Sequence, residues 1–306
     1  WKGTFRKSTF EAVSYAKDTA KLLGTDVVAL SIGDVSDDEL NKLGNYGASK
    51  VLSASGIAKG DSQGTSNLFA EHAKNAKVIV FASTYTSKMI APRLAAKLKA
   101  GMLSNVVDVP SSASPLTVSR KAFSGKAIEK AIVNTEKAII SLAPNAFGLK
   151  ECGEDCNIEQ ISASQTTSIT IEGEEIATGK ISLAEAEIIV SAGRGLKGPE
   201  NWGMVEELAD LFGAATACSK PVADIGWRPH GEHVGQTGKA VAPNLYVAIG
   251  ISGAIQHLAG VNSSKVMVVI NTDAEAPFFK AADYGIVGDA FDVVPRLIEE
   301  IKKVKN

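Results

Sequence analysis

Polar side chains that could bind a cofactor are concentrated in residues 234–271, which read VGQTGKAVAPNLYVAIGISGAIQHLAGVNSSKVMVVIN. Hydroxyl, amide and imidazole groups on small-residue turns alternate there with two apolar runs, 245–251 and 266–270. Such runs are typical of strands buried on both faces of a parallel sheet, whose ligands bind at the carboxyl ends of the strands. The stretch therefore predicts a site for a large, polyanionic, partly aromatic cofactor.

Two turns in this stretch supply most of the polar groups. The first is a glycine-flanked loop that comprises Val234, Gly235, Gln236 and Thr237. The second leads from the first apolar run into a short helix and comprises Ser252, Gly253, Ala254, Ile255, Gln256 and His257. Glycine lets a backbone approach a flat ring, and the first N–H groups of a helix attract phosphate. A plain surface turn and a structural histidine are the alternatives.

Two turns ahead of this stretch carry positive charge. Arg194 lies in the turn Ser-Ala-Gly-Arg-Gly between a strand and a helix, and Ser219 and Lys220 follow the next strand. Arginine binds phosphate through two parallel hydrogen bonds, and lysine binds it as a point charge. Neither turn has the full G-x-G-x-x-G pattern, so an ordinary strand-to-helix turn and a solvated lysine are the alternatives.

Two more polar residues lie at strand ends further along the chain. Asn271 ends the strand 266–270, and Asp289, followed by Ala290, comes after the strand 284–287. Doubly wound folds place ligand contacts at such positions. A capping or turn role is the alternative for each.

Chemistry carried by side chains alone is not indicated. The sequence has no G-x-S-x-G elbow, no Walker loop and no H-E-x-x-H, the motifs of common nucleophilic, phosphate-binding and zinc sites. His230 and His233, with one acid between them, are too few to define a metal site and indicate an exposed polar loop. A cofactor would therefore carry any reaction.

The bulk composition is that of an ordinary globular protein. Hydrophobic residues make up 45% and charged residues 22%, and the formal net charge is −2. That balance gives no electrostatic basis for binding nucleic acid or an anionic membrane. No apolar run reaches the length of about 18 residues that a transmembrane helix needs, so we expect no direct membrane insertion.

The cysteines indicate the compartment. Cys152, Cys156 and Cys218 form a sparse, odd set, which favours reduced thiols in a cytosol-like compartment. A local disulfide between Cys152 and Cys156, or half of a metal site, is the alternative. No signal or transit peptide is visible.

Strands alternate with helices in the first part of the chain. Ser8-Thr9-Phe10-Glu11 has the pattern of a capping box and predicts a helix that ends at Gly24. Strands are expected at 26–32, 50–54, 77–82 and 105–109, and helices at 66–76 and 87–100. Pro92 is early in the second of these helices and is expected to start or bend it. The alternation predicts an α/β domain with a mainly parallel sheet.

From residue 111 the strands become shorter, as at 138–142 and 168–171, and predict an antiparallel extension of the first domain. The polar, turn-rich segment 172–183 places a domain boundary near Ala184. Beyond it we expect strands at 187–190, 214–217, 245–251, 266–270 and 284–287, with a helix at 199–213. Asp292 is expected to cap the last helix, with Pro295 in its first turn. The prediction is an α/β protein of two domains, 1–183 and 184–306, each with a mainly parallel sheet flanked by helices, the second doubly wound.

Several segments together resemble the alpha subunit of electron transfer flavoproteins. The resemblance is close through the second domain, in GRGLKGPENW, SKPVADIGW, VGQTGKAVAPNLYVAIGISGAIQHLAG, VINTDAEAPFF and ADYGIVGDAFDVVP. It is looser in the first domain, where GNYGASKVL and APRLAAKL carry it. The resemblance implies a heterodimer with a beta subunit, in which the second domain binds FAD and the beta subunit binds AMP. Electrons would pass one at a time from flavin dehydrogenases, such as the acyl-CoA dehydrogenases of fatty acid β-oxidation, to a membrane electron transfer flavoprotein-quinone oxidoreductase.

The resemblance also implies roles for single residues. Arg194 and Ser219 would contact the phosphate end of FAD, and the loop from Val234 to Thr237 would wrap the isoalloxazine, with Thr237 near its reactive nitrogen. The segment from Ser252 to His257 would follow the ribityl-pyrophosphate, with His257 near the pyrimidine carbonyl. Asn271, Asp289 and Ala290 would contact the ribityl and adenosine portions.

Two departures from the family pattern matter. Lys220 stands where the family usually has an arginine that is expected to stabilise the anionic flavin semiquinone. Lysine keeps the charge and loses the planar fork, so we expect a less stabilised semiquinone. Family members also begin with a strand before the first helix, and we expect that strand to be missing from the sequence as it stands.

Three functions remain open at this stage. The first is an electron carrier without substrate turnover, and the second is a flavin-based bifurcating complex that oxidises NADH. The third is a nucleotide-binding subunit without redox chemistry. Segment 172–183 is a candidate hinge for a mobile FAD domain, and the bacterial cytoplasm or the mitochondrial matrix is the expected location.

Overall fold

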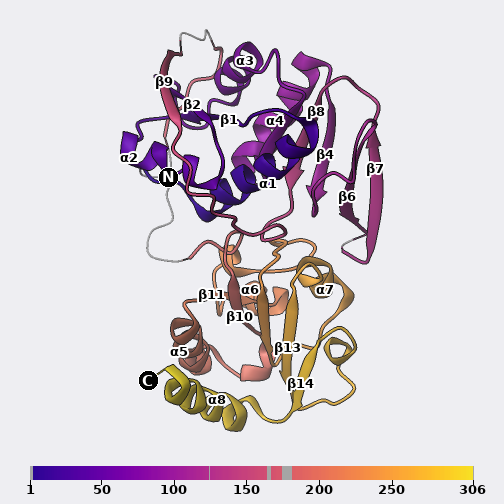
Figure 1. Ribbon diagram of the computed structural model, residues 1–306. Helices are drawn as coiled ribbons and strands as arrows, with labels where there is room; N and C mark the ends of the chain where they lie inside the picture. The colour runs from indigo at the N-terminus through magenta and orange to yellow at the C-terminus, as the bar shows by residue number, and fades with distance from the viewer. Residues whose placement is uncertain (1–2, 124, 164–166, 174–180, 306) are drawn as a thin grey trace. The chain divides into compact units, whose positions relative to one another are not determined.

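The computed structural model describes residues 3–123, 125–163, 167–173 and 181–305 (Figure 1). The chain divides into two compact units, one of Trp1–Ala122 with Ala127–Ile176, the other of Phe123–Lys126 with Ala177–Asn306. Separate hydrophobic clusters form the core of each unit. The expected hinge, 172–183, falls largely on residues 174–180, which lie outside the described residues.

The first unit contains helices that flank two sheets. Its helices are α1 (Lys7–Leu23), α2 (Asp37–Asn41), α3 (Ser62–His72) and α4 (Tyr85–Leu98), with the 3-10 turn η1 (Gly44–Tyr46). Its strands are β1 (Val28–Ile32), β2 (Lys50–Ser55), β3 (Val78–Ala82), β4 (Gly101–Val106), β5 (Ser112–Ala113), β6 (Leu116–Ala122), β7 (Ala127–Val133), β8 (Ala138–Leu142) and β9 (Asn157–Ser162).

The first unit's strands form one parallel sheet and one mixed sheet. The first has the order β1-β2-β9, and the second has the order β3-β8-β4-β6-β5, with β7 paired to β6. β5, β6 and β7 are antiparallel neighbours, as expected for the region after residue 111. β8 differs from that expectation, because it lies parallel between β3 and β4 and all five of its residues are buried. Four of its five residues are apolar, which suits a central strand better than an edge.

The two sheets approach each other at β1 and β3. A cavity of about 510 Å³ separates these edge strands and is lined by residues of both strands and of α1, among them Ala16, Leu30 and Val80. Neither β1 nor β3 has a second neighbouring strand among the described residues. Val28 of β1 consequently remains 55% exposed.

The start of α1 differs from the predicted capping box. Arg6 is the N-cap residue, and its side chain forms no capping hydrogen bond. The helix begins at Lys7, one residue before Ser8. The Glu11 carboxylate, which the capping box would use locally, instead accepts N–H bonds from Phe147 and Gly148 at 2.8 and 3.0 Å. Gly24 ends the helix at φ 64°, as predicted.

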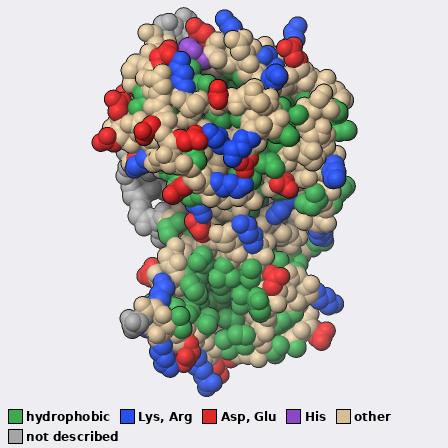
Figure 2. Space-filling model, viewed as in Figure 1, with side chains coloured by type: hydrophobic (Ala, Val, Ile, Leu, Met, Phe, Trp, Pro, Cys, Tyr) green, Lys and Arg blue, Asp and Glu red, His purple; other side chains and the backbone are tan. Residues whose placement is uncertain are grey.

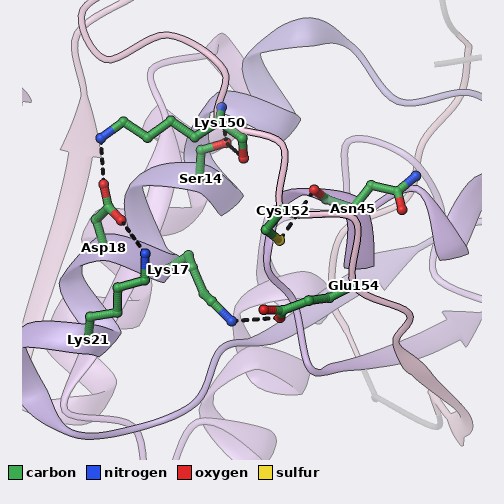
Figure 3. Close-up of polar contacts among 8 residues, drawn as sticks. All are labelled: Ser14, Lys17, Asp18, Lys21, Asn45, Lys150, Cys152 and Glu154. Carbon is green, nitrogen blue, oxygen red and sulfur yellow. Dashed lines mark hydrogen bonds and ion pairs between the residues drawn. The ribbon is translucent and has the colours of Figure 1, made fainter.

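The segment 147–156 is held against α1 by further polar contacts (Figure 3). Lys150 Nζ lies 2.6 Å from Asp18 and its backbone N–H donates to Ser14 Oγ at 3.1 Å. Lys17 pairs with Glu154 at 2.7 Å. These contacts hold the segment 147–156 against α1. The chain then continues into β9, which pairs with β2.

Other boundaries shift because side chains cap the backbone at places the pattern did not identify. Asp61 accepts from the N–H of Gly64, so α3 begins four residues earlier than predicted. Thr84 caps α4, which leaves Pro92 in the interior of the helix. The predicted strands 105–109 and 168–171 are wrong: β4 ends at Val106, and Ser168 donates to the Gln63 side chain instead of a neighbouring strand.

The second unit contains a single parallel sheet. Its strands are β10 (Ile188–Ala192), β11 (Ala215–Cys218), β12 (Leu245–Ile249), β13 (Val266–Asn271) and β14 (Tyr284–Val287). Its helices are α5 (Gly203–Phe212), α6 (Lys220–Asp224), α7 (Ile255–Val261) and α8 (Ala290–Lys305), with 3-10 turns η2 (Arg194–Leu196), η3 (Pro199–Trp202), η4 (His230–Glu232) and η5 (Pro277–Lys280). The order β11-β10-β12-β13-β14 reverses between β10 and β12. The prediction of a doubly wound parallel sheet is therefore confirmed.

Both faces of this sheet are buried along its central strands. On β12, Val247 and Ile249 pack under α5 and α8, whereas Tyr246 and Ala248 belong to the opposite face. The cover is incomplete at β14, where Tyr284 and Ile286 are 67% and 41% exposed. Figure 2 shows hydrophobic side chains gathered on one face of this unit.

Candidate functional site

The carboxyl ends of β10 and β12 meet through backbone alone. Gly193 N–H donates to Ile249 O at 2.9 Å, and Gly195 N–H donates to Gly250 O at 3.1 Å. A Cβ on Gly193 would overlap the Gly250 carbonyl, and one on Gly195 would lie 2.6 Å from Gly250 Cα. The strand order reverses at this point, where a doubly wound sheet opens a crevice for a nucleotide. Only glycine permits so close an approach, so this edge is lined by backbone.

Two positively charged residues are exposed along this edge. Arg194 begins η2 directly after Gly193 and is exposed. Lys220 is the first residue of α6 and is also exposed, whereas its neighbour Ser219 is 7% exposed and donates its N–H to Ala192 O at 3.1 Å. The structure thus brings the turns of Arg194 and Ser219 to adjacent strand ends, as the sequence predicts.

The loop 234–238 is fixed from both sides. Val234 is fully buried and donates its N–H to Cys218 O at 3.0 Å. Gly235 adopts φ 148° and lies against the first turn of α7, where Gln236 N–H donates to Gln256 O at 2.7 Å. Thr237 and Gln236 are exposed. The loop therefore presents two polar side chains to solvent from a backbone that is held in place.

The turn into α7 is shaped by one close contact. Gly253 has φ 82°, and a Cβ there would lie 2.6 Å from the backbone nitrogen of Phe278. The Ser252 carbonyl accepts the N–H of that same Phe278 at 3.0 Å. The neighbouring side chains at the edge are exposed, namely Ser252, Ala254, Ile255 and Gln256. Glycine is required here because the chain turns directly over an aromatic residue.

His257 differs from the exposed residues before it. The imidazole is 7% exposed, and its Nε2 lies 3.0 Å from the Tyr246 hydroxyl. Burial lowers the pKa of His257 to about 4, and the charge of nearby His233 acts in the same direction, while a backbone contact with Val234 opposes both. His257 is therefore neutral at neutral pH.

The last three predicted residues have local partners. Asn271 donates its amide to Ile251 O at 3.0 Å. Asp289 accepts the Phe291 N–H at 3.0 Å at the start of α8, and this hydrogen bond holds its pKa below the ordinary value. Asp289, not Asp292, thus provides the acceptor at this helix end, and Pro295 lies inside the helix. Ala290 is the buried first residue of α8.

Lys197 and Tyr246 contact predicted site residues but carry no sequence signal. Lys197 Nζ lies 3.4 Å from Asp289, which links η2 to the start of α8. Tyr246 reads as one more apolar residue of a buried strand, yet its hydroxyl meets His257. Lys197 and Asp289 are 92 residues apart, and Tyr246 and His257 are 11 residues apart on two different elements, so local spacing predicts neither pairing.

The expectation of an exposed loop at 230–233 is wrong in part. His233 is 7% exposed and Glu232 is 6% exposed. Arg228 binds both carboxylate oxygens of Glu232 at 2.7 and 2.9 Å, which draws the turn inward. No His, Cys, Asp or Glu cluster of the described residues could hold a metal ion. Cys152, Cys156 and Cys218 are free thiols, so the local disulfide is not formed.

Family models and curated relatives both match the chain. A model described as the electron transfer flavoprotein domain matches residues 2–166, and one described as the electron transfer flavoprotein FAD-binding domain matches residues 182–262. The electron transfer flavoprotein subunit alpha of Bacillus subtilis is 38% identical over 99% of this chain and 95% of its own. That of Pseudomonas aeruginosa is 39% identical over 91% of each chain.

The chain belongs to the electron transfer flavoprotein alpha subunit family. Its cofactor is FAD, which the matched FAD-binding domain specifies, and its relatives are electron transfer proteins that pair with a beta subunit. The matched range contains the glycine-lined edge, the loop 234–238 and His257.

The residues at this edge suit FAD. The close approach of Gly193 and Gly250 leaves backbone where a pyrophosphate must pass. Two buried polar atoms close to this edge have no hydrogen-bond partner of ordinary geometry among the described residues. They are Ser191 Oγ of β10 and His257 Nδ1 of α7. Buried polar atoms without partners are uncommon and mark places where a ligand or water completes the structure.

Proposed function

We propose that this chain is the FAD-binding subunit of an electron carrier. The carrier accepts electrons from flavin dehydrogenases, such as acyl-CoA dehydrogenases, and passes them to a membrane electron transfer flavoprotein-quinone oxidoreductase. The observation that carries the proposal is the glycine-lined edge between β10 and β12, within the matched FAD-binding domain. When bound there, FAD supplies the redox chemistry by accepting and releasing electrons singly. The protein's own residues bind and orient it.

The proposed contacts follow the order of the turns along the edge. Arg194, which is exposed, and the Ser219 hydroxyl stand near the phosphates. Lys220, exposed at the start of α6, brings its charge to the flavin ring. The isoalloxazine lies along the loop 234–238, whose exposed side chains are Gln236 and Thr237. The chain of the cofactor passes the turn of Ser252, Gly253, Ala254, Ile255, Gln256 and His257. Asn271, Asp289 and Ala290 complete the site on the β13–β14 side.

The partner and the compartment belong to the same proposal. The carrier is a heterodimer with a beta subunit that binds AMP, and it acts in the bacterial cytoplasm, in line with its bacterial relatives. Among the described residues, no helix is both long and apolar enough to cross a membrane.

Flavin stoichiometry and reduction by a dehydrogenase test the proposal. The purified heterodimer should contain one FAD, and its flavin should be bleached by an acyl-CoA dehydrogenase with its substrate but not by NADH alone. Two FAD molecules and direct oxidation of NADH would support a bifurcating complex instead. A preparation without flavin absorbance after FAD is added would contradict both.

A further inference from the structure

A buried hydrogen bond connects β12 to α7 next to the loop 234–238. The Tyr246 hydroxyl and His257 Nε2 lie 3.0 Å apart, and the two side chains are 0% and 7% exposed. Tyr246 points to the face of the sheet that α7 covers, where Phe278 stacks on its ring at a centroid distance of 6.3 Å. The pair is therefore fixed by packing on both sides.

Both groups are uncharged, and the direction of this hydrogen bond depends on the tautomer of His257. Burial raises the pKa of Tyr246 above its ordinary value, so its hydroxyl keeps its proton. Ser191 lies next to the same oxygen. His257 is neutral, and a neutral imidazole has one donor nitrogen and one acceptor nitrogen. The Val234 backbone contact raises the pKa of His257, as an acceptor of a ring proton does, and this favours a proton on Nδ1 with Nε2 accepting from Tyr246.

The second nitrogen of His257 is also inside the protein. Nδ1 is buried and has no hydrogen-bond partner of ordinary geometry among the described residues. The backbone group that acts on the ring is that of Val234, the first residue of the loop. The titratable groups whose charge acts on the pair are His233, which acts on His257, and Cys218, which acts on Tyr246.

The loop rests on the helix that His257 belongs to. Gln236 N–H donates to Gln256 O at 2.7 Å, and Val241 N–H donates to Gly260 O at 2.9 Å. A Cβ on Gly260 would lie 2.5 Å from Gly235 Cα. The loop backbone is thus in direct contact with α7, and any shift of the helix moves the loop.

We propose that Tyr246 is a positioning residue for FAD: its hydroxyl fixes the tautomer and orientation of His257, and the imidazole braces the loop 234–238 from within. The inference rests on the proposed placement of the isoalloxazine along that loop. Both ring nitrogens are buried, and the backbone of Val234 in the loop acts on the ring. Tyr246 thereby supports a cofactor that it does not touch.

The substitution Tyr246→Phe tests the positioning role of the hydroxyl, because it removes this one group and keeps the buried ring. The heterodimer is prepared with the alpha chain labelled with ¹⁵N-histidine; the chain has four histidines, so their spectra are readily separated. In the wild type without FAD, His257 should carry its proton on Nδ1. In the variant, the proton should be shared between both nitrogens. Exchange of the Gln236 amide and dissociation of FAD should each be faster by about fivefold, the effect of one lost hydrogen bond of about 1 kcal/mol.

Tyr85→Phe is the matched control, since this tyrosine is 65% exposed on α4 of the other unit. It should change none of the three measurements. A wild-type His257 protonated on Nε2 would overturn the proposal. So would a Tyr246→Phe variant whose tautomer, Gln236 exchange and FAD dissociation all equal those of the control. The tautomer and exchange measurements need no dehydrogenase, so they give a result even if the proposed carrier function fails.

Discussion

Single side chains at the sheet edge decide how charge is placed around the cofactor. Lys220 is exposed at the start of α6 and brings a flexible point charge to this edge. A guanidinium at the same position would bring a planar fork that donates two parallel hydrogen bonds. The two cations are therefore expected to hold a negatively charged flavin to different degrees.

We predict that Lys220→Arg raises the yield of the one-electron-reduced flavin, because arginine stabilises the anionic ring by hydrogen bonds as well as charge. A stepwise reduction titration followed by absorbance measures the yield. Lys265→Arg, an exposed lysine just before β13, is the control and should leave the yield unchanged. An equal or lower yield in Lys220→Arg would show that the fork adds nothing.

The buried histidines predict that the second unit loses stability in acid. In the folded state burial lowers the pKa of His257 to about 4, from an ordinary value of 6.5, and burial lowers the pKa of His233 too. Between pH 6.5 and 4 the unfolded chain thus binds more protons, so the free energy of unfolding falls as pH falls. For His257 the loss approaches about 3 kcal/mol, at about 1.4 kcal/mol per pKa unit.

Chemical denaturation of the second unit across this pH range measures the effect. His257→Gln should flatten the pH dependence because the titrating group is gone. His72→Gln, at an exposed position on α3, should retain the wild-type dependence. Parallel curves for wild type and His257→Gln would refute the assignment.

At the scale of elements, the site depends on how closely the ends of neighbouring elements approach. The turns after β10 and β12 touch through glycines, and the segment 147–156 is drawn against α1 by a buried carboxylate. Both arrangements use the backbone of one element as the partner of another. Substitutions there act through packing and hydrogen bonding and not through local conformation.

We predict that Gly193→Ala lowers the free energy of unfolding by about 1–3 kcal/mol, the usual cost of overpacking, and weakens FAD binding. Gly193 has φ −119°, which alanine adopts freely, so the effect is steric overlap with Gly250. Gly203→Ala is the control, because a Cβ there meets nothing within 4 Å. Thermal unfolding with and without FAD measures both effects, and equal behaviour of the two variants would contradict the prediction.

Glu11→Ala should destabilise the first unit by about 2 kcal/mol. The substitution leaves the N–H groups of Phe147 and Gly148 without their acceptor. A buried donor without a partner costs about 1–3 kcal/mol, and these two half-buried donors are each expected at the lower end of that range. Glu299→Ala, at an exposed position of α8, should change stability by less than about 0.5 kcal/mol. Hydrogen exchange of the Phe147 and Gly148 amides locates the loss, and unchanged protection there would exclude this role for Glu11.

At the scale of the whole molecule, the second unit has apolar surface suited to a partner subunit. Val268 of β13 pairs with Tyr284 of β14, and Ile286 lies on the same face of β14. Tyr284 and Ile286 are both exposed. Contiguous apolar surface of this kind marks interaction sites. We expect the beta subunit to cover it.

Ile286→Asp should weaken the heterodimer at least about tenfold, since it places a charge in an interface that would otherwise be apolar. Sedimentation of the mixed subunits measures the dissociation constant. Val304→Asp, at an 86% exposed position near the end of α8, is the matched control. If both variants associate like the wild type, the beta subunit binds elsewhere.

Local patterns predicted the elements of the second unit well. The strand 284–287 was predicted at its observed bounds, and the apolar runs at 245 and 266 were placed within two residues of β12 and β13. These strands are buried on both faces, so their apolar runs are uninterrupted. Predictions failed where polar side chains act at a distance: Glu11 does not cap its own helix, and Ser168 binds Gln63.

Residue types and their spacing are enough to predict the strands of the second unit, the order of its turns and the family segments that imply FAD, because burial and turn chemistry act locally. The contact of Gly193 with Gly250, the central place of β8 and the contact of Tyr246 with His257 follow from the packed fold alone. Each of these contacts joins separate elements, and its geometry depends on how whole elements pack. Residue type alone shows which groups are available, and packing decides which of them meet.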